Sequence, residues 1–244
     1  MLRSQRVKKE NPVDNSGFRM RGINVSRVEG ISDAIFGLAI TLIVVSLQVP
    51  KTFDELTQTL RGFLGAAACT AILLQIWNRH YQYFRRYGIE DGMTRVLNGT
   101  LLFVVIAYVY PLKFLFNASI DSIFGIKTPR IELGYREVPK LFVIYGLGFA
   151  LVYLLFGLMY WHALRKRQEL ELSNTEYLQT RWILGEHLLM GSSGLISVVL
   201  ALVLPLHISF YAGFAYFLIP IFETVLWSRH GVALRRQQAQ ERVV

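Results

Sequence analysis

The feature that most constrains this chain is a series of apolar blocks, each close to the length needed to cross a lipid bilayer. A transmembrane helix needs about 20 consecutive and mainly apolar residues. Six such blocks occur, over residues 32–49, 62–77, 96–116, 141–162, 187–204 and 209–227. Only the short link 205–208 separates the last two blocks, which indicates a tight helical hairpin. The sequence therefore predicts an all-α integral membrane protein, with six transmembrane helices in a single domain over residues 1–244.

The composition and the missing motifs exclude several classes of function. Hydrophobic residues make up 53% of the 244 and charged residues only 18%, whereas about a quarter of a soluble domain is charged. The single cysteine, Cys69, cannot form a disulfide within the chain. The sequence contains no phosphate-binding loop, no zinc-protease motif and no nucleophile elbow, and its five histidines lack ligand spacing. We therefore expect no enzyme activity, no cofactor and no bound metal.

The net charge of +9 reflects membrane orientation and does not indicate nucleic-acid binding. Nineteen of the 26 lysines and arginines fall in the tails and in the connections after the second and fourth blocks. The other side of the predicted bundle carries only seven. Because basic residues accumulate on the cytoplasmic side of a membrane protein, we expect both termini to be cytoplasmic, with basic tails over residues 1–26 and 228–244.

The first apolar block has a distinct stripe along one helical face. At about 100° per residue, Ser32 and Asp33 point away from this stripe. Its members are apolar except for one hydroxyl, and they are Leu38, Thr41, Leu42, Val45 and Val49. Such a stripe is typical either of ordinary helix packing or of a face that lines a pore.

Asp33 is the ionisable residue that the first block draws towards the membrane. At that depth a carboxylate is costly and needs a partner, unless it caps the helix at the headgroup level. Counting at about 1.5 Å per residue places Asp33 and Trp77 at a similar depth. His80 lies three residues after Trp77 and shares its helical face. The carboxylate could therefore accept a hydrogen bond from the indole or from the imidazole, although Trp77 could equally be a membrane-interface aromatic.

A short stretch of the fourth block needs a separate interpretation. Residues 145–148 read Tyr-Gly-Leu-Gly, similar to the carbonyl filter of tetrameric potassium channels. They lie inside an apolar block with no re-entrant loop beside it, so we predict glycines that pack helices together.

The residues of the first block resemble a known family. The run from Arg27 through Ser32 and Asp33 to Leu42 is similar to the start of the first helix in the transmembrane protein 175 family of potassium channels. Ile31 replaces the family's phenylalanine and leaves the hydroxyl and the carboxylate in place. Further points of similarity are the Trp-x-x-His pattern and two residues of the third block, namely Trp77, His80, Asn98 and Pro111.

The resemblance implies a homotetramer in a bacterial inner membrane, with four copies of the first helix around a central pore. It implies permeation of potassium and other monovalent cations without a carbonyl filter. In that family pattern Leu38 forms the narrowest apolar ring, Leu42 and Val45 form further apolar layers of the gate, and Thr41 supplies a hydroxyl ring for selectivity. The pattern also assigns a polar network that supports the pore helix, formed by Arg27, Ser32, Asp33, Trp77 and His80.

Two alternatives to a channel remain open from the sequence. Asp33 and Glu223 are acids within apolar blocks, which would suit an ion- or proton-coupled secondary transporter. A membrane scaffold without transport would need no special residues at all.

Overall fold

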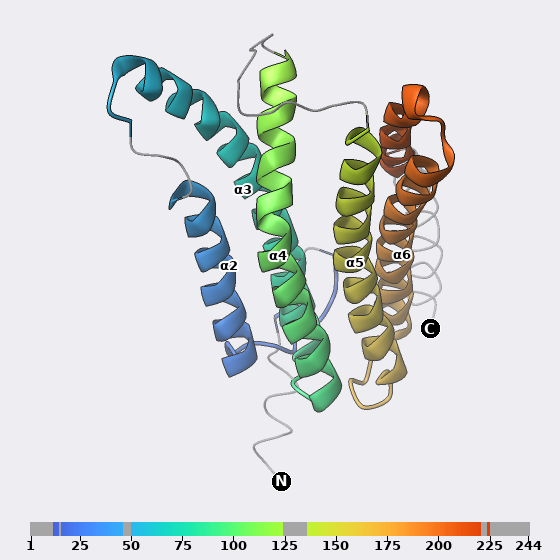
Figure 1. Cartoon of the computed structure of the whole chain (residues 1–244). Coiled ribbons are helices and arrows are strands. Elements are labelled where there is room, and N and C mark those ends of the chain that lie inside the picture. Colours follow the sequence, from blue (N-terminus) through green and yellow to red (C-terminus); the bar gives the residue numbers. More distant parts are fainter. Residues whose placement is uncertain (1–11, 15, 46–49, 124–135, 221–223, 225–244) are drawn as a thin grey trace.

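Five long helices and one 3₁₀ helix form the part of the chain that the computed structural model describes, which is residues 12–14, 16–45, 50–123, 136–220 and 224. Figure 1 shows the helices side by side in one bundle. They are α2 (Arg27–Val45), α3 (Phe53–Tyr87), α4 (Gly92–Ile123), α5 (Val138–Arg165), α6 (Asn174–Val203) and the 3₁₀ helix η1 (Leu206–Phe217). Over these ranges the only β-type pairing is one isolated bridge between Val13 and Arg19. The all-α prediction is confirmed.

Five helices, α2 to α6, are long and apolar enough to cross a membrane, counted over the described ranges. Each contains the core of one predicted block, and α3 extends well beyond residues 62–77 at both ends. The sixth predicted block, 209–227, is described only as far as Pro220 and at Thr224, and it begins within η1. The sixth span therefore stays a prediction, and the predicted tail over 228–244 lies outside the described residues.

Successive helices run in opposite directions, so the connections gather at the two ends of the bundle. The turn 88–91 and the loop 166–173 lie at one end, and the links that precede α3 and follow α6 lie at the other (Figure 1). In the same view α2 occupies one edge of the bundle and α6 the opposite edge. Helix α2 packs against α3 and α4, and α5 packs against α4 and α6.

Glycines bring α5 and α6 into close contact. A Cβ atom added to Gly146 would lie 2.7 Å from the carbonyl oxygen of Gly194, and one added to Gly194 would lie 2.8 Å from that of Gly146. Only glycine fits where two helix backbones approach this closely. Residues 145–148 are part of the continuous helix α5, so the prediction of packing glycines is confirmed.

The described part of the segment before α2 docks across the ends of α3 and α6. The Phe18 ring is fully buried, and its centroid lies 5.5 Å from that of Tyr87. Arg21 forms a 2.7 Å ion pair with Glu176, at the start of α6. Arg85 donates hydrogen bonds to the carbonyl oxygens of Gly22 and Ile23. Part of the predicted basic tail is therefore a packed segment that leads the chain into α2.

The turn between α3 and α4 is held by the carboxylate of Asp91. It accepts a 2.8 Å hydrogen bond from the backbone N–H of Thr94, which caps the start of α4. It also lies 2.7 Å from His162 Nε2 and 3.1 Å from Lys166 Nζ. Burial alone would raise the pKa of Asp91, but these hydrogen bonds outweigh it and hold the pKa well below its usual value.

Candidate pore helix and the contacts that position it

Helix α2 has two faces with opposite environments. The residues of one face are buried against α3 and α4, and they are Glu29, Ser32, Phe36, Ala39 and Ile43. Their spacing of three and four residues is that of one stripe on an α-helix. The protomer therefore fixes which side of α2 is turned inward.

The predicted pore stripe lies on the other side of α2. Leu38 is 53% exposed and Val45 is 71% exposed, although both are apolar. Thr41 is exposed between them, and its hydroxyl donates a 2.9 Å hydrogen bond to the carbonyl oxygen of Gly37. Leu42 is partly buried at the margin of this face. Val49, the last member of the stripe, lies outside the described residues.

A buried chain of hydrogen bonds joins three helices. The hydroxyl of Ser32 on α2 donates to the Val28 carbonyl oxygen at 2.7 Å and accepts from the amide nitrogen of Asn98 on α4 at 2.9 Å. The amide oxygen of Asn98 lies 2.8 Å from His80 Nε2 on α3. Because the amide nitrogen faces Ser32, its oxygen faces the imidazole, and His80 must carry its proton on Nε2. Asn98 therefore connects all three helices.

A second contact joins α2 and α3 nearer the surface. The indole Nε1 of Trp77 donates a 2.7 Å hydrogen bond to Asp33 Oδ1. The Trp77 ring also stacks on Tyr81, one turn further along α3, with centroids 5.8 Å apart. The predicted contact between Asp33 and Trp77 is thus present. The alternative in which Ser32 or Asp33 caps the helix is wrong, because the hydroxyl of Ser26 accepts the capping bond from the Glu29 N–H.

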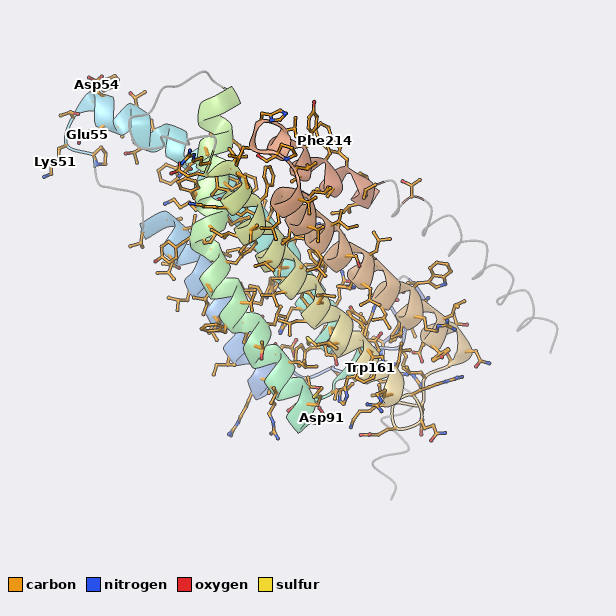
Figure 2. All side chains as sticks on the ribbon, turned by 45° about the vertical axis from the view of Figure 1, so that its right-hand side comes forward. Lys51, Asp54, Glu55, Asp91, Trp161 and Phe214 are labelled. Atoms are coloured by element: carbon orange, nitrogen blue, oxygen red, sulfur yellow. The ribbon has the colours of Figure 1, made fainter. Side chains whose placement is uncertain are left out.

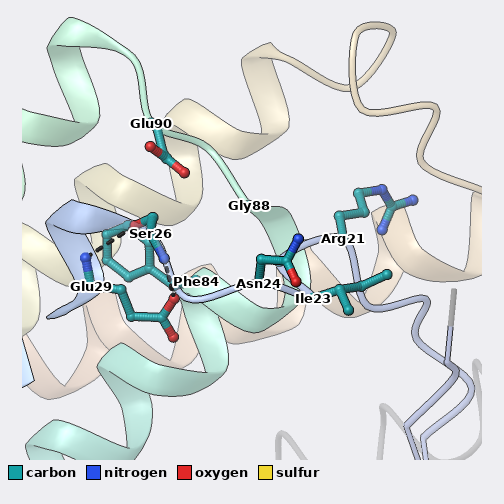
Figure 3. Close-up of a pocket in the computed structure, with 9 residues that line it drawn as sticks. Arg21, Ile23, Asn24, Ser26, Glu29, Phe84, Gly88 and Glu90 are labelled. Carbon is teal, nitrogen blue, oxygen red and sulfur yellow. Dashed lines mark hydrogen bonds between the residues drawn. The ribbon is translucent and has the colours of Figure 1, made fainter. Parts of the chain in front are cut away.

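Both ends of α2 are held by neighbouring side chains. At its start, Ser26 and Glu29 bond reciprocally, as Figure 3 shows, with the carboxylate accepting from the Ser26 N–H. At its end, Lys113 Nζ on α4 donates a 3.0 Å hydrogen bond to the carbonyl oxygen of Ile43. A cation suits this end because the last carbonyl groups of a helix have no partner within the helix and carry partial negative charge.

A cavity of about 290 Å³ opens beside the start of α2 (Figure 3). Two carboxylates, those of Glu29 and Glu90, belong to its lining, and its arginine, Arg21, is committed to Glu176. The remaining lining residues are Gly22, Ile23, Asn24, Ser26, Phe84 and Gly88. No three His, Cys, Asp or Glu side chains that could hold a metal ion gather anywhere in the described ranges.

The structure brings together four of the five residues predicted to support the pore helix. Arg27 is the exception, because it is exposed and makes no hydrogen bond or ion pair with the part of the protomer that the structure describes. Sequence reasoning used Asn98 only as part of a family pattern and missed its position between Ser32 and His80. It counted Lys113 only as a loop charge. An amide or an ammonium group within an apolar helix was the available signal in both cases.

The comparisons with known proteins agree with this arrangement. The profile of the endosomal/lysosomal potassium channel TMEM175 matches residues 27–108, which run from the start of α2 into α4. A potassium channel of Marivirga tractuosa is 40% identical over 218 residues, which cover 85% of this chain and 88% of that protein.

Two solved structures share the architecture. A crystal structure of the potassium channel MtTMEM175, in complex with a Nanobody-MBP fusion protein, superimposes with a TM-score of 0.79 at 36% identity. That match covers 89% of this chain and 100% of the solved chain. A lysosomal potassium-selective channel TMEM175 homologue from Chamaesiphon minutus matches with a TM-score of 0.50 at 22% identity, over 82% and 96% of the two chains, which supports the fold alone.

Proposed function

This chain belongs to the TMEM175 family of potassium channels as a bacterial member, and from that premise we propose that it conducts potassium through a pore lined by α2. Its relatives are potassium channels and not enzymes, so the expectation that it is not an enzyme is confirmed. The proposed assembly is a homotetramer in the bacterial inner membrane, with the four α2 helices around a central axis.

One observation carries the proposal, namely the division of α2 into a fixed face and an exposed face. The fixed face is tied to α3 and α4 by the contacts of Ser32 and Asp33. The exposed face presents Leu38 and Thr41 away from the protomer. A single protomer cannot surround an ion with one stripe. Four copies related by symmetry would enclose a path along that stripe, and such closed symmetry is the rule for homo-oligomers.

The gate in this proposal is a ring of four Leu38 side chains. An apolar ring offers nothing to replace the hydration shell of a cation, so a narrow ring loses its water and blocks conduction. Leu42 and Val45 would add apolar layers along the same path. The gate must therefore widen before potassium can pass.

Selectivity is assigned to Thr41 rather than to backbone carbonyl groups. Its hydroxyl hydrogen is directed at the Gly37 carbonyl oxygen, which leaves the lone pairs of Oγ1 free to face a cation. The hydroxyl lies about 4.5 Å along the helix from the Leu38 position. Helix α2 is α-helical from Arg27 to Val45, so its own carbonyl groups are engaged in the helix and do not line the path.

The polar contacts would hold α2 in register at the pore. The assigned residues are Arg27, Ser32, Asp33, Trp77 and His80, to which the buried amide of Asn98 is added. In this proposal Arg27 acts in the assembled tetramer, where its exposed guanidinium would meet a neighbouring protomer. The uneven distribution of basic residues supports cytoplasmic termini, which would place the end of the bundle with residues 12–26 in the cytoplasm.

Reconstitution into liposomes with a potassium gradient tests the function. A channel gives rapid flux without a coupled ion, whereas slow, saturable flux that needs a proton or sodium gradient would assign the chain to the transporters instead. Thr41→Ala should keep the flux and weaken the discrimination between potassium, sodium and caesium. Native mass spectrometry in mild detergent should give a tetramer, and a stable monomer or dimer would refute the central pore.

A further inference from the structure

The end of the α5–α6 pair carries three arginines that rest on aromatic rings. The guanidinium carbon of Arg165 lies 4.5 Å from the ring centroid of Trp161, one turn earlier on α5. Those of Arg167, in the loop, and Arg181, on α6, lie 4.2 Å and 5.9 Å from the centroid of Tyr177. Arg165 and Arg181 are exposed, and Trp161 is 41% exposed. We call this group the α5–α6 arginine cluster.

These arginines differ from most basic side chains at the same end of the bundle. Arg19, Arg21, Arg79, Arg86 and Lys166 each form an ion pair with an acidic side chain. Among the residues that the structure describes, no carboxylate pairs with Arg165, Arg167 or Arg181. The charge of the cluster is therefore uncompensated within the protomer.

Stacking on a ring prepares a guanidinium for an anion. The ring contacts the flat face of the group and fixes its orientation, but it leaves the N–H donors at the edge. Only Arg167 uses one of these donors in the protomer, for a 2.8 Å hydrogen bond to Asn174. The planar edge of arginine matches two oxygens of a phosphate group.

The aromatic rings of the cluster lie on one side of the helix pair. On α5 the exposed residues fall on a single stripe, consisting of Ile144, Leu147, Leu151, Leu158, Trp161 and Arg165. On α6 the exposed stripe includes Arg181, Leu188, Leu195, Val199 and Leu202. Each stripe lies about 100° in the same rotational sense from the glycine contact with the other helix. Because the two helices are antiparallel, both stripes face the same side of the pair.

The depth of the cluster is that of a membrane interface. Figure 2 shows Trp161 near the end of α5, close to the α5–α6 loop and at the same end of the bundle as Asp91. Tryptophan and tyrosine are enriched at the headgroup level of membrane proteins. The leucine stripes begin directly beside the cluster and extend towards the other end. An amphiphile with an anionic head and apolar tails matches this sequence of surfaces.

We propose that the α5–α6 arginine cluster binds the phosphate of an anionic phospholipid, whose acyl chains lie along the exposed stripes of α5 and α6. Basic groups at the cytoplasmic ends of transmembrane helices bind anionic headgroups. With the orientation proposed above, the lipid belongs to the inner leaflet. The proposal is independent of conduction, because it requires only that these helices span the membrane.

The test measures lipid binding to the purified full-length protein in a neutral detergent. Native mass spectrometry and thermal shifts are recorded with dioleoylphosphatidylglycerol and with dioleoylphosphatidylcholine. The intact protein should prefer the anionic lipid. The double variant R165Q/R181Q should bind it about 25-fold more weakly, at about fivefold per arginine, and keep its affinity for phosphatidylcholine. The matched control is Arg95→Gln, which removes an exposed arginine without a ring or an ion pair at the same end and should change nothing.

Further arms separate the possible sources of the effect. The variant R165K/R181K keeps the charge without the planar edge, so it should recover only part of the affinity. Inorganic phosphate at millimolar concentration should not compete, because it has no acyl chains. Equal weakening by Arg95→Gln, an unchanged preference in R165Q/R181Q, or effective competition by inorganic phosphate would each overturn the lipid site. Loss of tetramers in R165Q/R181Q, with an unchanged lipid preference, would assign the surface to a second copy of the chain.

Discussion

Asn98 is the residue whose replacement tests most directly how the pore helix is held. Its side chain is buried and links Ser32 on α2 to His80 on α3 through two hydrogen bonds. Asn98→Leu removes both bonds while keeping a similar side-chain volume, so the change does not open a large cavity. The loss of stability therefore reports mainly on the hydrogen bonds.

The expected magnitude follows from what each partner retains. Ser32 still donates to the Val28 carbonyl oxygen, so it loses only a bond that it accepts. His80 loses the partner of Nε2, and its Nδ1 has none among the described residues, which leaves the whole imidazole without a hydrogen bond. A buried donor without a partner costs about 1–3 kcal/mol, and single hydrogen bonds between membrane helices average about 0.6 kcal/mol with a maximum near 1.7. We expect a loss of about 1–2 kcal/mol for Asn98→Leu.

The assay is equilibrium unfolding of the purified protein in mixed micelles, combined with a double-mutant cycle. His80→Phe keeps a ring at the buried site, and the pair Asn98→Leu with His80→Phe should show a coupling energy of about 1 kcal/mol. Thr100→Val serves as the control, because its exposed hydroxyl bonds only to the carbonyl oxygen of Val96 on the same helix. Additive single effects, or a loss for Thr100→Val equal to that for Asn98→Leu, would refute the role of this buried link.

Three further predictions concern the gate, the surface contact and the turn. Leu38→Ala should raise basal potassium flux in liposomes by widening the apolar ring, whereas Ile40→Ala, on a partly buried face, should not; the opposite result would place the pore on the wrong side of α2. Asp33→Asn keeps an acceptor for the indole on an exposed surface, so the melting temperature of the tetramer should change little, and altered ion selectivity would instead place Asp33 in the pore. The depressed pKa of Asp91 stabilises the fold fully above about pH 4 and loses this effect as the pH falls towards the folded-state pKa, so Asp91→Asn should flatten the acid loss of stability between about pH 5 and 3.

The sequence predicted the helices well because membrane spans are set by length and hydrophobicity. It underestimated α3, which continues through the polar residues at both of its ends, including Asp54, Glu55, Arg85 and Arg86. Hydrophobic length identifies only the part of a helix inside the bilayer. Local capping then decides where the helix stops, and Gly88, with φ of 59°, ends α3 in the left-handed conformation that suits glycine.

The site was predictable where it depended on one helix or on depth, and not where it depended on register. Helical phase separated Leu38 and Thr41 from Ser32, and counting residues brought Asp33 level with Trp77. The choice of indole over imidazole as the partner of Asp33 could not be derived in this way. His80 lies on the buried side of α3 and bonds to Asn98, which requires the register of α4 against two other helices. Side-chain packing sets that register, and no pattern within one helix contains it.

The contacts of α2 also limit how the proposed gate can open. A rotation of α2 about its own axis would carry Ser32 away from Asn98 and expose Phe36 and Ile43, which are now buried. Burial of each such side chain contributes about 1.5–3 kcal/mol, so rotation of one helix costs several kcal/mol, and a tetramer would pay it four times. A tilt of α2 together with α3 and α4 keeps these contacts and still moves Leu38 away from the axis. We therefore expect the three helices to move as one unit during opening, with the change of packing concentrated where α4 meets α5.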